Sequence, residues 1–511
     1  MRYLGDSRTS VANDEELQRW GFDVGVLGGL RLSLAHEPKP ALGIASSPAI
    51  QDAEPEQAPR RPYAIVVAGA TGFTGRLMVE HLDAIYTAGQ ADASSKKWAI
   101  AGRNLNRLRS LASSCRSSPD VLLADSDASL EEVARQAIVL VAAAGPYSQC
   151  GEMAVRACVK SKTHYVDVSG ETIWMQNMLE RYHEEAKEKG VLVVQAAAQV
   201  CAIDDINCYL LAQKLGPLKQ FREYFFQYGG TTGGTFATNA AGMEDMTEEK
   251  LKVQNDPFSL GGRRARGVQP EDHDCSETAQ DPIYSSLWLQ PAYNGHTGGR
   301  ILRRSCQLFE EAEGDSAPRY GKDLLVVIRD AAQSKRAGEM AAKAMAPIRS
   351  IEDAKMAAGL MKMQVAQGQM PKPGEGPPPE TRAHYFSEVF ALGEAEDGRW
   401  AHVHYTGPEA YEVTAMAAVT GALVIVEEEE TIQPARRGGI VTPAFAFHGT
   451  SYVRRLEAMA FAAAKSGRRM SFRLEDGKPT EDVLKEAITR KTKSAVQGQA
   501  EINAGKLRAW A

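Results

Sequence analysis

The stretch AIVVAGATGFTGR at residues 64–76 decides the fold. A β-branched run ends at Gly69, where glycine permits a tight turn because it tolerates positive φ. Gly72 and Gly75 follow at GxxGxxG spacing, and helical spacing of apolar residues begins directly after them. Such a turn brings backbone N–H groups and a helix dipole close to a pyrophosphate. We predict a dinucleotide-binding turn formed by Gly69, Thr71, Gly72, Phe73, Thr74 and Gly75. The alternative is a glycine-rich loop of another purpose.

Strand and helix signals alternate after this turn. Apolar strands are expected at 98–101, 121–125, 138–144, 164–168 and 191–195, with helical patterns between them. The strand at 138–144 is apolar throughout, as expected when both faces of a parallel sheet are covered. This repeated β-α-β order is typical of a doubly wound parallel sheet. We therefore predict an α/β fold with a Rossmann domain at residues 62–215.

The pattern changes after about residue 215. We expect a second α/β (α+β) domain at 216–406, of substrate-binding or dimerisation type, and a C-terminal helical segment at 407–511. Within them the sequence predicts a strand at 221–228, a flexible loop at 229–235 and mixed strands and turns at 281–329. Further expectations are a helix at 335–369, a Pro/Gly linker at 370–379, two strands at 386–405 and helices at 409–428 and 452–465. Residues 1–61 are rich in Gly, Pro, Ser and Ala, which predicts a flexible arm.

Composition excludes several classes of function. A formal net charge of -6 gives no general attraction to nucleic acid. The 7 cysteines form no CxxC pair, which argues against a disulfide framework and a zinc site. His402 and His404 share one strand face, but no further ligand accompanies them, so no metal site is expected. The apolar run at 413–426 is shorter than the roughly 20 residues of a spanning helix, which favours a core helix in a soluble protein.

Early acids in the N-terminal arm disfavour a mitochondrial transit peptide. We expect a cytoplasmic protein, and organellar targeting by the arm and peripheral membrane contact stay open.

The second strand ends in Gly102-Arg103-Asn104, which decides the predicted cofactor. NAD binders commonly place an acid there to accept from the ribose 2′-hydroxyl, and this chain has none. A guanidinium suits the 2′-phosphate of NADP instead. We predict NADP(H), held at this end by Arg103 and Asn104; the alternative is that Arg103 is a surface residue.

Two further loops follow parallel strands and are expected at the nicotinamide end. The first runs from Gly145 and Pro146 to Gln149, and the second spans residues 167–171. We predict that Gly145 and Pro146 bind the cofactor. The polar candidates are Tyr147 as the catalytic proton donor and Asp167, Ser169 and Glu171 near the substrate. The alternatives are a packing role for Tyr147, a helix cap for Asp167 and a solvated acid for Glu171.

The proton donor is otherwise open. A bound water could serve instead of Tyr147. A Tyr with a Lys four residues later, which short-chain dehydrogenases need, is absent from the sequence.

These motifs resemble the saccharopine dehydrogenase-like oxidoreductases, which include the trans-acting enoyl reductases. The resemblance rests on VVAGATGFTGR (66–76), WAIAGRN (98–104), AAAGPYSQCG (142–151) and THYVDVSGE (163–171). It continues in RILRRS (300–305), PKPGEGP (371–377), GPEAYEVTA (407–415) and GGIVTPA (438–444), so it covers about residues 62–450.

The resemblance implies NADP(H), C-terminal helices that pack back on the Rossmann domain, and reduction of a lipid-like substrate by hydride transfer. It also implies association with lipid droplets or membranes and leaves a homodimer open. Gly233, Gly234, Thr235 and the run Arg303-Arg304-Ser305 could line the second domain's side of the site, or the arginines could form structural ion pairs. Two alternatives are a non-catalytic NADP(H)-binding scaffold on lipid surfaces and a true saccharopine dehydrogenase of lysine metabolism.

One segment departs from the family. Its relatives usually carry a CGFDS-P-S-D-like loop after the sixth strand, whereas this chain has AAQVCAIDD at 197–205. Asp205 alone falls in place and is the candidate near the substrate. The change implies a different substrate or lost turnover.

Overall fold

The computed structural model describes residues 61–90, 96–199, 201–264, 267–312, 319–345, 347–432, 438–461 and 466–510. All of them lie in one compact unit, Ala58–Ala511. The predicted N-terminal arm falls outside the described residues, apart from Arg61.

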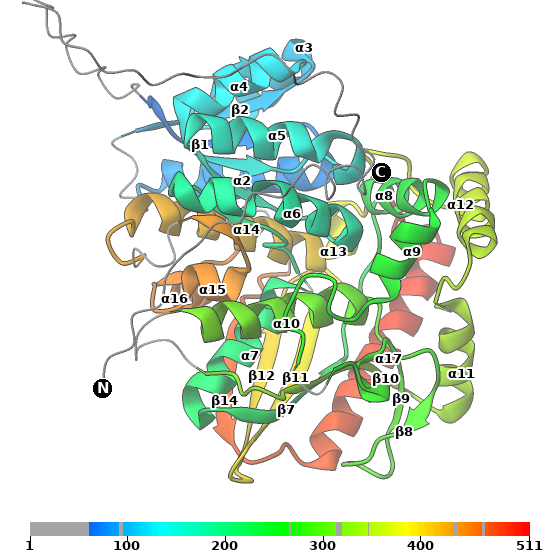
Figure 1. Ribbon diagram of the computed structural model, residues 1–511. Coiled ribbons are helices and arrows are strands. Elements are labelled where there is room, and N and C mark those ends of the chain that lie inside the picture. The colour runs from blue at the N-terminus through cyan, green and yellow to red at the C-terminus, as the bar shows by residue number, and fades with distance from the viewer. Residues whose placement is uncertain are drawn as a thin grey trace, which may run out of the picture. The chain divides into compact units, whose positions relative to one another are not determined.

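Sheet A is a seven-stranded parallel sheet that contains the predicted turn (Figure 1). Its order is β13-β6-β5-β4-β1-β2-β3, so the strand order reverses between β1 and β4. Its strands are β1 (Tyr63–Ala68), β2 (Lys97–Gly102), β3 (Asp120–Leu123), β4 (Ala137–Ala142), β5 (His164–Asp167), β6 (Leu192–Val194) and β13 (Gly439–Val441). The late strand β13 pairs with β6, so the C-terminal part of the chain completes this sheet. The predicted doubly wound sheet and the return of the C-terminal segment are confirmed.

Helices cover both faces of sheet A. One hydrophobic cluster joins the sheet to α2 (Phe73–Thr87), α3 (Leu105–Ser114) and α14 (Ala410–Glu427). A second cluster joins the opposite face to α4 (Asp127–Gln136), α5 (Tyr147–Ser161) and α6 (Thr172–Glu188). The strands are apolar on both sides because both faces are covered.

Sheet B is a seven-stranded mixed sheet of order β14-β12-β11-β7-β10-β9-β8. Only β7 and β10 pair in parallel. The strands are β7 (Leu218–Phe225), β8 (Ala279–Gln280), β9 (Trp288–Pro291), β10 (Leu325–Ala332), β11 (Ser387–Ala395), β12 (Trp400–Gly407) and β14 (Ser471–Asp476). The predicted hairpin of β11 and β12 and the predicted second α/β domain are therefore confirmed.

Helices α7 (Ala202–Leu215) and α10 (Gly295–Glu311) cover one face of sheet B, and α17 (Glu481–Asn503) covers the other. The remaining elements are α8 (Gly233–Glu244), α9 (Glu248–Asn255), η3 (Pro270–Asp272), α11 (Lys335–Ala344), α12 (Ile351–Ala366), α13 (Pro379–Arg382), α15 (Pro443–Phe447) and α16 (Tyr452–Ala458). Although α7 falls within the predicted limits of the Rossmann domain, it packs on β11 and β12. The domain limits at 215 and 406 stay predictions.

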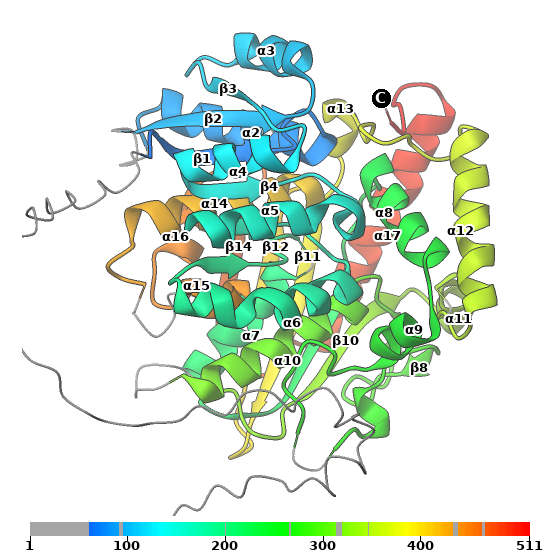
Figure 2. The ribbon, with the colours of Figure 1, turned by 45° about the horizontal axis from the view of Figure 1, so that its top comes forward.

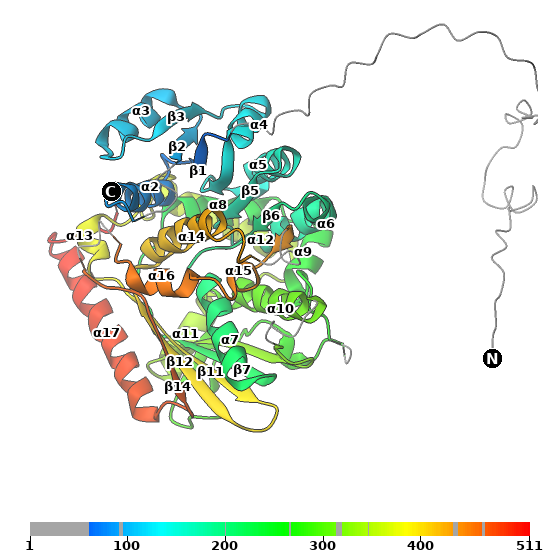
Figure 3. The same cartoon turned by 90° about the vertical axis from the view of Figure 1, so that its left-hand side faces the viewer.

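Helix α14 lies between the two sheets, as Figure 3 shows. It contacts β1, β4, β5 and α2, and the cluster that contains it continues through α7 to sheet B. Among the described residues, α14 is long and apolar enough to cross a membrane by length and composition alone. Because 78% of its apolar window is buried inside the protein, the same properties suit the predicted core helix.

Three predictions outside the Rossmann part were wrong in detail. The expected loop at 229–235 ends in helix α8, whose first turn is capped by the Thr232 side chain accepting from Thr235 N at 3.3 Å. The expected mixture of strands and turns at 281–329 contains the 17-residue helix α10. Three glycines near the start of α10 lower its helix propensity, and burial of its apolar face overrides that preference. The expected single helix at 335–369 is divided into α11 and α12.

Candidate cofactor and substrate site

The glycine turn between β1 and α2 is tight. Gly69 has φ +79°, and its N–H donates to Ala101 O at 3.0 Å. Gly72 N donates back to Gly69 O at 3.0 Å, and a Cβ at Gly75 would overlap that same carbonyl oxygen. Glycine is required at both ends of the turn, because a side chain would strain the backbone at Gly69 and would collide with a carbonyl oxygen at Gly75.

The start of α2 is open to an anion. Gly72 is its N-cap and supplies no side-chain hydrogen bond. The first N–H groups of a helix have no intrahelical acceptor, so they remain donors at the positive end of the dipole. Thr71 and Thr74 are partly exposed beside them. This cradle without side chains fits the pyrophosphate of a dinucleotide.

Phe73 ties the turn to the second half of the chain. Its ring makes an edge contact with Tyr411, with centroids 5.6 Å apart, and Arg382 lies over it at 5.8 Å. A Cβ at Gly376 would come within 2.5 Å of the Phe73 ring, so the segment PKPGEGP packs directly on it. Arg76 donates to Thr71 O at 2.9 Å and to Gly374 O at 3.0 Å. The Phe73 side chain is thus used for packing, and binding of the cofactor by its N–H stays a prediction.

Arg103 is exposed and directly follows β2, the strand that pairs with β1 and so lies beside the glycine turn. Cys150 lies near Arg103. Burial raises the pKa of the Cys150 thiol, and the positive charge of Arg103 partly offsets this rise. Asn104 caps α3, and its side chain accepts from Arg107 N at 3.0 Å. The exposed guanidinium and the absence of an acid at this strand end fit a 2′-phosphate.

The loop after β4 places Gly145 at the surface and Tyr147 inside. The Tyr147 hydroxyl donates to Ala142 O at 2.7 Å and accepts from Val168 N at 3.3 Å. Its ring lies 5.1 Å from Trp174, and burial raises the pKa of Tyr147 well above its usual value. These contacts match the packing role that the sequence also allowed.

The polar side chains after β5 accept hydrogen bonds from main-chain N–H groups. Glu171 accepts from Tyr147 N at 2.5 Å and from Ser148 N at 3.0 Å, so it caps the start of α5. Asp167 accepts from Ser169 N at 3.0 Å and Ala196 N at 2.9 Å, and Ser169 Oγ accepts from Glu171 N at 3.1 Å. Burial raises the pKa of Asp167 to about 7. The three residues therefore hold together the loops after β4, β5 and β6.

Asp205 connects three elements. It accepts from Ser305 Oγ of α10 at 2.6 Å and from Ala444 N of α15 at 2.8 Å, and Ser305 also lies 2.6 Å from Thr442 Oγ1. Burial raises the pKa of Asp205 to about 7. The other residues of 197–205, the segment that departs from the family pattern, are buried as well. Val200 lies outside the described residues.

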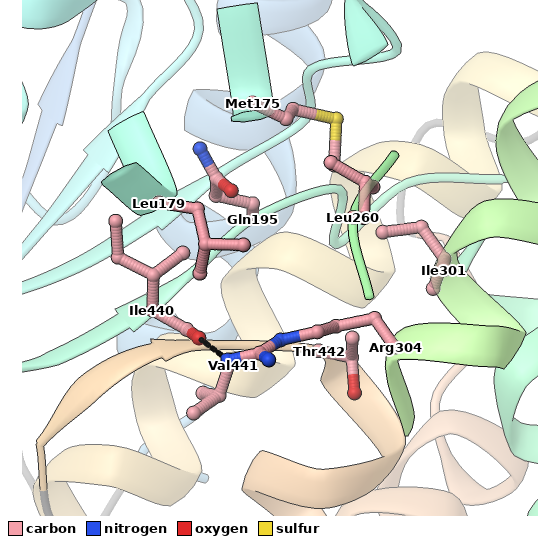
Figure 4. A pocket seen from close by; sticks show the side chains of 9 residues that line it. All are labelled: Met175, Leu179, Gln195, Leu260, Ile301, Arg304, Ile440, Val441 and Thr442. Carbon is pink, nitrogen blue, oxygen red and sulfur yellow. Dashed lines mark hydrogen bonds between the residues drawn. The ribbon is translucent and has the colours of Figure 1, made fainter. Parts of the chain in front are cut away.

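The run Arg303-Arg304-Ser305 is also structural. Arg303 donates to Pro257 O at 3.2 Å and Asp272 O at 3.1 Å, and Arg304 donates to Ile440 O at 3.4 Å. Figure 4 shows Arg304 beside a cavity of about 10 Å³ between α6, α10 and β13. That volume holds at most one water, so neither cofactor nor substrate fits there.

Sequence reasoning missed the residues that face Gly145. A Cβ at Gly145 would lie 3.3 Å from Thr238 Oγ1 of α8, and the next residue, Asn239, donates to the Tyr293 hydroxyl at 3.1 Å. No motif marks these positions, because α8 comes from a distant part of the chain.

Comparison with known proteins agrees with the predicted NADP-binding domain. The saccharopine dehydrogenase NADP-binding domain family matches residues 65–194. These residues form an NADP-binding domain of that type. The resemblance to saccharopine dehydrogenase-like oxidoreductases is thereby confirmed, and the cofactor of this NADP-dependent oxidoreductase is NADP(H).

Relatives extend the match beyond this domain. A trans-acting enoyl reductase of Mycobacterium ulcerans (strain Agy99) is 28% identical over 407 residues, covering 76% of this chain and 94% of the relative. A trans-acting enoyl reductase of Mycobacterium tuberculosis (strain ATCC 25618 / H37Rv) is 27% identical over 408 residues, covering 76% of this chain and 94% of the relative. Saccharopine dehydrogenase (L-Glu forming) from Saccharomyces cerevisiae is a solved structure with a TM-score of 0.40 and 12% identity, covering 80% of this chain and 99% of that one.

Replacement of Arg103 tests the cofactor end of the site. Arg103→Glu is expected to raise the Kd for NADPH by about tenfold or more, because a charge-assisted contact with the 2′-phosphate is lost. The Kd for NADH is expected to change little, and fluorescence titration measures both. Arg109→Glu, on the exposed side of α3, is the matched control. Equal NADPH affinity in Arg103→Glu would contradict the assignment.

A second prediction concerns stability and pH. Because the folded pKa of Asp205 is raised to about 7, the protonated carboxyl stabilises the fold below the unfolded pKa, and this contribution is lost as pH rises towards 7. In Asp205→Asn the decline in unfolding free energy between pH 5 and pH 8 is expected to be smaller by about 2 to 4 kcal/mol. Denaturant unfolding at both pH values measures it, with the exposed Asp482→Asn as control. The same decline in all three proteins would refute this expectation.

Proposed function

We propose that this oxidoreductase reduces the carbon–carbon double bond of a lipid-like enoyl substrate with NADPH. The supporting observation is the length of the match to trans-acting enoyl reductases, which covers 76% of the chain and extends well beyond the NADP-binding domain at 65–194. The substrate-facing half of a reductase lies outside its Rossmann domain, so similarity there bears on the substrate class.

The residues of the site support such a reaction. NADPH, when bound, supplies a hydride. The turn amides and the α2 dipole would hold its pyrophosphate, and Arg103 its 2′-phosphate. Gly145, without a side chain, follows β4 at the point where the order of sheet A reverses, which is where ligands bind in such sheets. Phe73 and its covering segment exclude water from one side of the turn.

Turnover tests the proposal directly. Full-length protein is expected to oxidise NADPH on addition of trans-2-dodecenoyl-CoA and to form the saturated acyl thioester in equal amount, as followed by absorbance and mass spectrometry. Dodecanoyl-CoA, which lacks the double bond, is the control. NADPH binding without turnover on enoyl and keto thioesters would support the scaffold alternative. Saccharopine-dependent reduction of NADP would support a role in lysine metabolism.

A lipid surface is the second part of the proposal. Four exposed apolar side chains lie on α11 and α12, namely Met340, Met356, Leu360 and Met363. Residues 356, 360 and 363 share one face of α12, opposite the buried Ala354 and Ala358. Lys343 and Lys355 lie exposed on the same two helices and favour anionic headgroups, whereas Lys362 pairs with Glu244 of α8. Figure 2 shows α12 beside α8, which carries the residues facing Gly145. Cytoplasmic location and a homodimer stay predictions.

Replacing this face tests membrane contact. The triple variant Met356→Gln, Leu360→Gln, Met363→Gln is expected to lose about tenfold or more of its affinity for vesicles of phosphatidylcholine and phosphatidylglycerol, because apolar side chains no longer enter the bilayer surface. Co-sedimentation measures the affinity. Val496→Gln, at an exposed position of α17, is the control. Unchanged vesicle affinity in the triple variant would contradict the proposed contact.

A further inference from the structure

Tyr293 is the one exposed tyrosine among those that the structure describes. The residue is 64% exposed, so solvent reaches its side chain. Its hydroxyl accepts from Asn239 Nδ2 at 3.1 Å, so the hydroxyl proton is available to another acceptor.

The backbone of Tyr293 is held firmly. The next residue, Asn294, is buried and donates to Asp204 Oδ2 at 3.1 Å. Gly295 N closes a turn onto Ala292 O at 3.1 Å. Thr297, in the first turn of α10, donates to Gly170 O of the loop after β5 at 3.1 Å. An exposed side chain on an anchored backbone is the arrangement expected of a residue that acts on a ligand, because its position costs little to maintain.

Helix α8 brings this hydroxyl to the cofactor side of sheet A. Thr238 contacts Gly145 and the adjacent Asn239 binds Tyr293. At the start of the same helix, Thr235 Oγ1 lies 2.7 Å from the Tyr411 hydroxyl, and Tyr411 packs on Phe73 of the glycine turn. Helix α8 therefore contacts both Tyr411 beside the glycine turn and Gly145 after β4, and it binds Tyr293 through the residue next to Thr238.

We propose that the Tyr293 hydroxyl, oriented by Asn239, is the hydrogen-bond and proton donor to the carbonyl oxygen conjugated with the substrate's double bond. This inference rests on the proposed enoyl reduction. The hydride adds to the β-carbon, the carbon–carbon π bond breaks, and its electron pair moves onto the carbonyl oxygen. The Tyr293 O–H bond breaks as its proton passes to that oxygen. The resulting enol takes a proton from water at the α-carbon and returns one to Tyr293. The substrate gains two electrons and NADPH becomes NADP⁺.

The test compares full-length wild type, Tyr293→Phe and the control Tyr182→Phe, in which the hydroxyl that is lost belongs to α6 and donates to Glu152 of α5 at 2.9 Å. Three readouts are used: the Kd for NADPH, kcat and KM with trans-2-dodecenoyl-CoA, and the Kd for that thioester on the NADP⁺-loaded protein, where no hydride is available. In Tyr293→Phe we expect kcat to fall about 100-fold or more. The Kd for NADPH should stay within about twofold, and thioester binding to the NADP⁺ form should weaken about fivefold through the lost hydrogen bond.

The outcomes separate the inference from the proposed function. If wild type reduces the thioester and Tyr293→Phe keeps its kcat within about threefold, the role of Tyr293 is overturned and enoyl reduction stands. If wild type binds NADPH and reduces nothing, enoyl reduction is wrong, and the thioester titration alone decides. Weaker binding in Tyr293→Phe then supports its contact with the carbonyl oxygen. Equal thioester binding in wild type and Tyr293→Phe, or no thioester binding in wild type, overturns the proposed contact of Tyr293.

Discussion

The burial of α14 between the two sheets is the constraint on which the site depends. This helix is apolar on nearly every side, and its side chains belong to the same cluster as α2, sheet A and sheet B. Its first turn carries Tyr411 and Glu412, which hold α8 through Thr235 and α13 through Arg382. Because α14 is fixed by burial, the parts that cover the glycine turn are fixed with it.

Polar groups inside this core set the relative position of its elements. Arg382 donates to Glu412 at 3.0 Å, and both side chains are buried. Asp205 joins α7 to α10 and α15 through Ser305 and Ala444. A buried pair of this kind contributes little net stability, but an arrangement that separates the partners leaves a buried polar group unsatisfied. Such groups therefore select one packing of α7, α10 and α15.

Local pattern was enough to predict β1 to β6 of sheet A and the hairpin of β11 and β12, whereas the late strand β13 was not predicted. Buried parallel strands are continuous apolar runs, and each run was followed by a helix with regular spacing. The same reasoning failed for α8 and α10, which begin with glycines that favour turns. Those helices form because tertiary burial and the Thr232 cap offset the weak propensity, and neither contribution is visible in a short window of sequence.

The sequence by itself predicted the dinucleotide turn, the cofactor NADP(H) and the resemblance to saccharopine dehydrogenase-like oxidoreductases. These features depend on neighbouring residues, since glycine spacing and a strand end are local. Only the tertiary structure decided which tyrosine side chain is buried and which is exposed. Tyr147 follows Gly145-Pro146 in a predicted cofactor loop yet lies inside against Trp174, whereas Tyr293 comes from a distant turn and is exposed beside α8. Whether a hydroxyl meets the core or a ligand depends on the packing of distant elements, which no local pattern encodes.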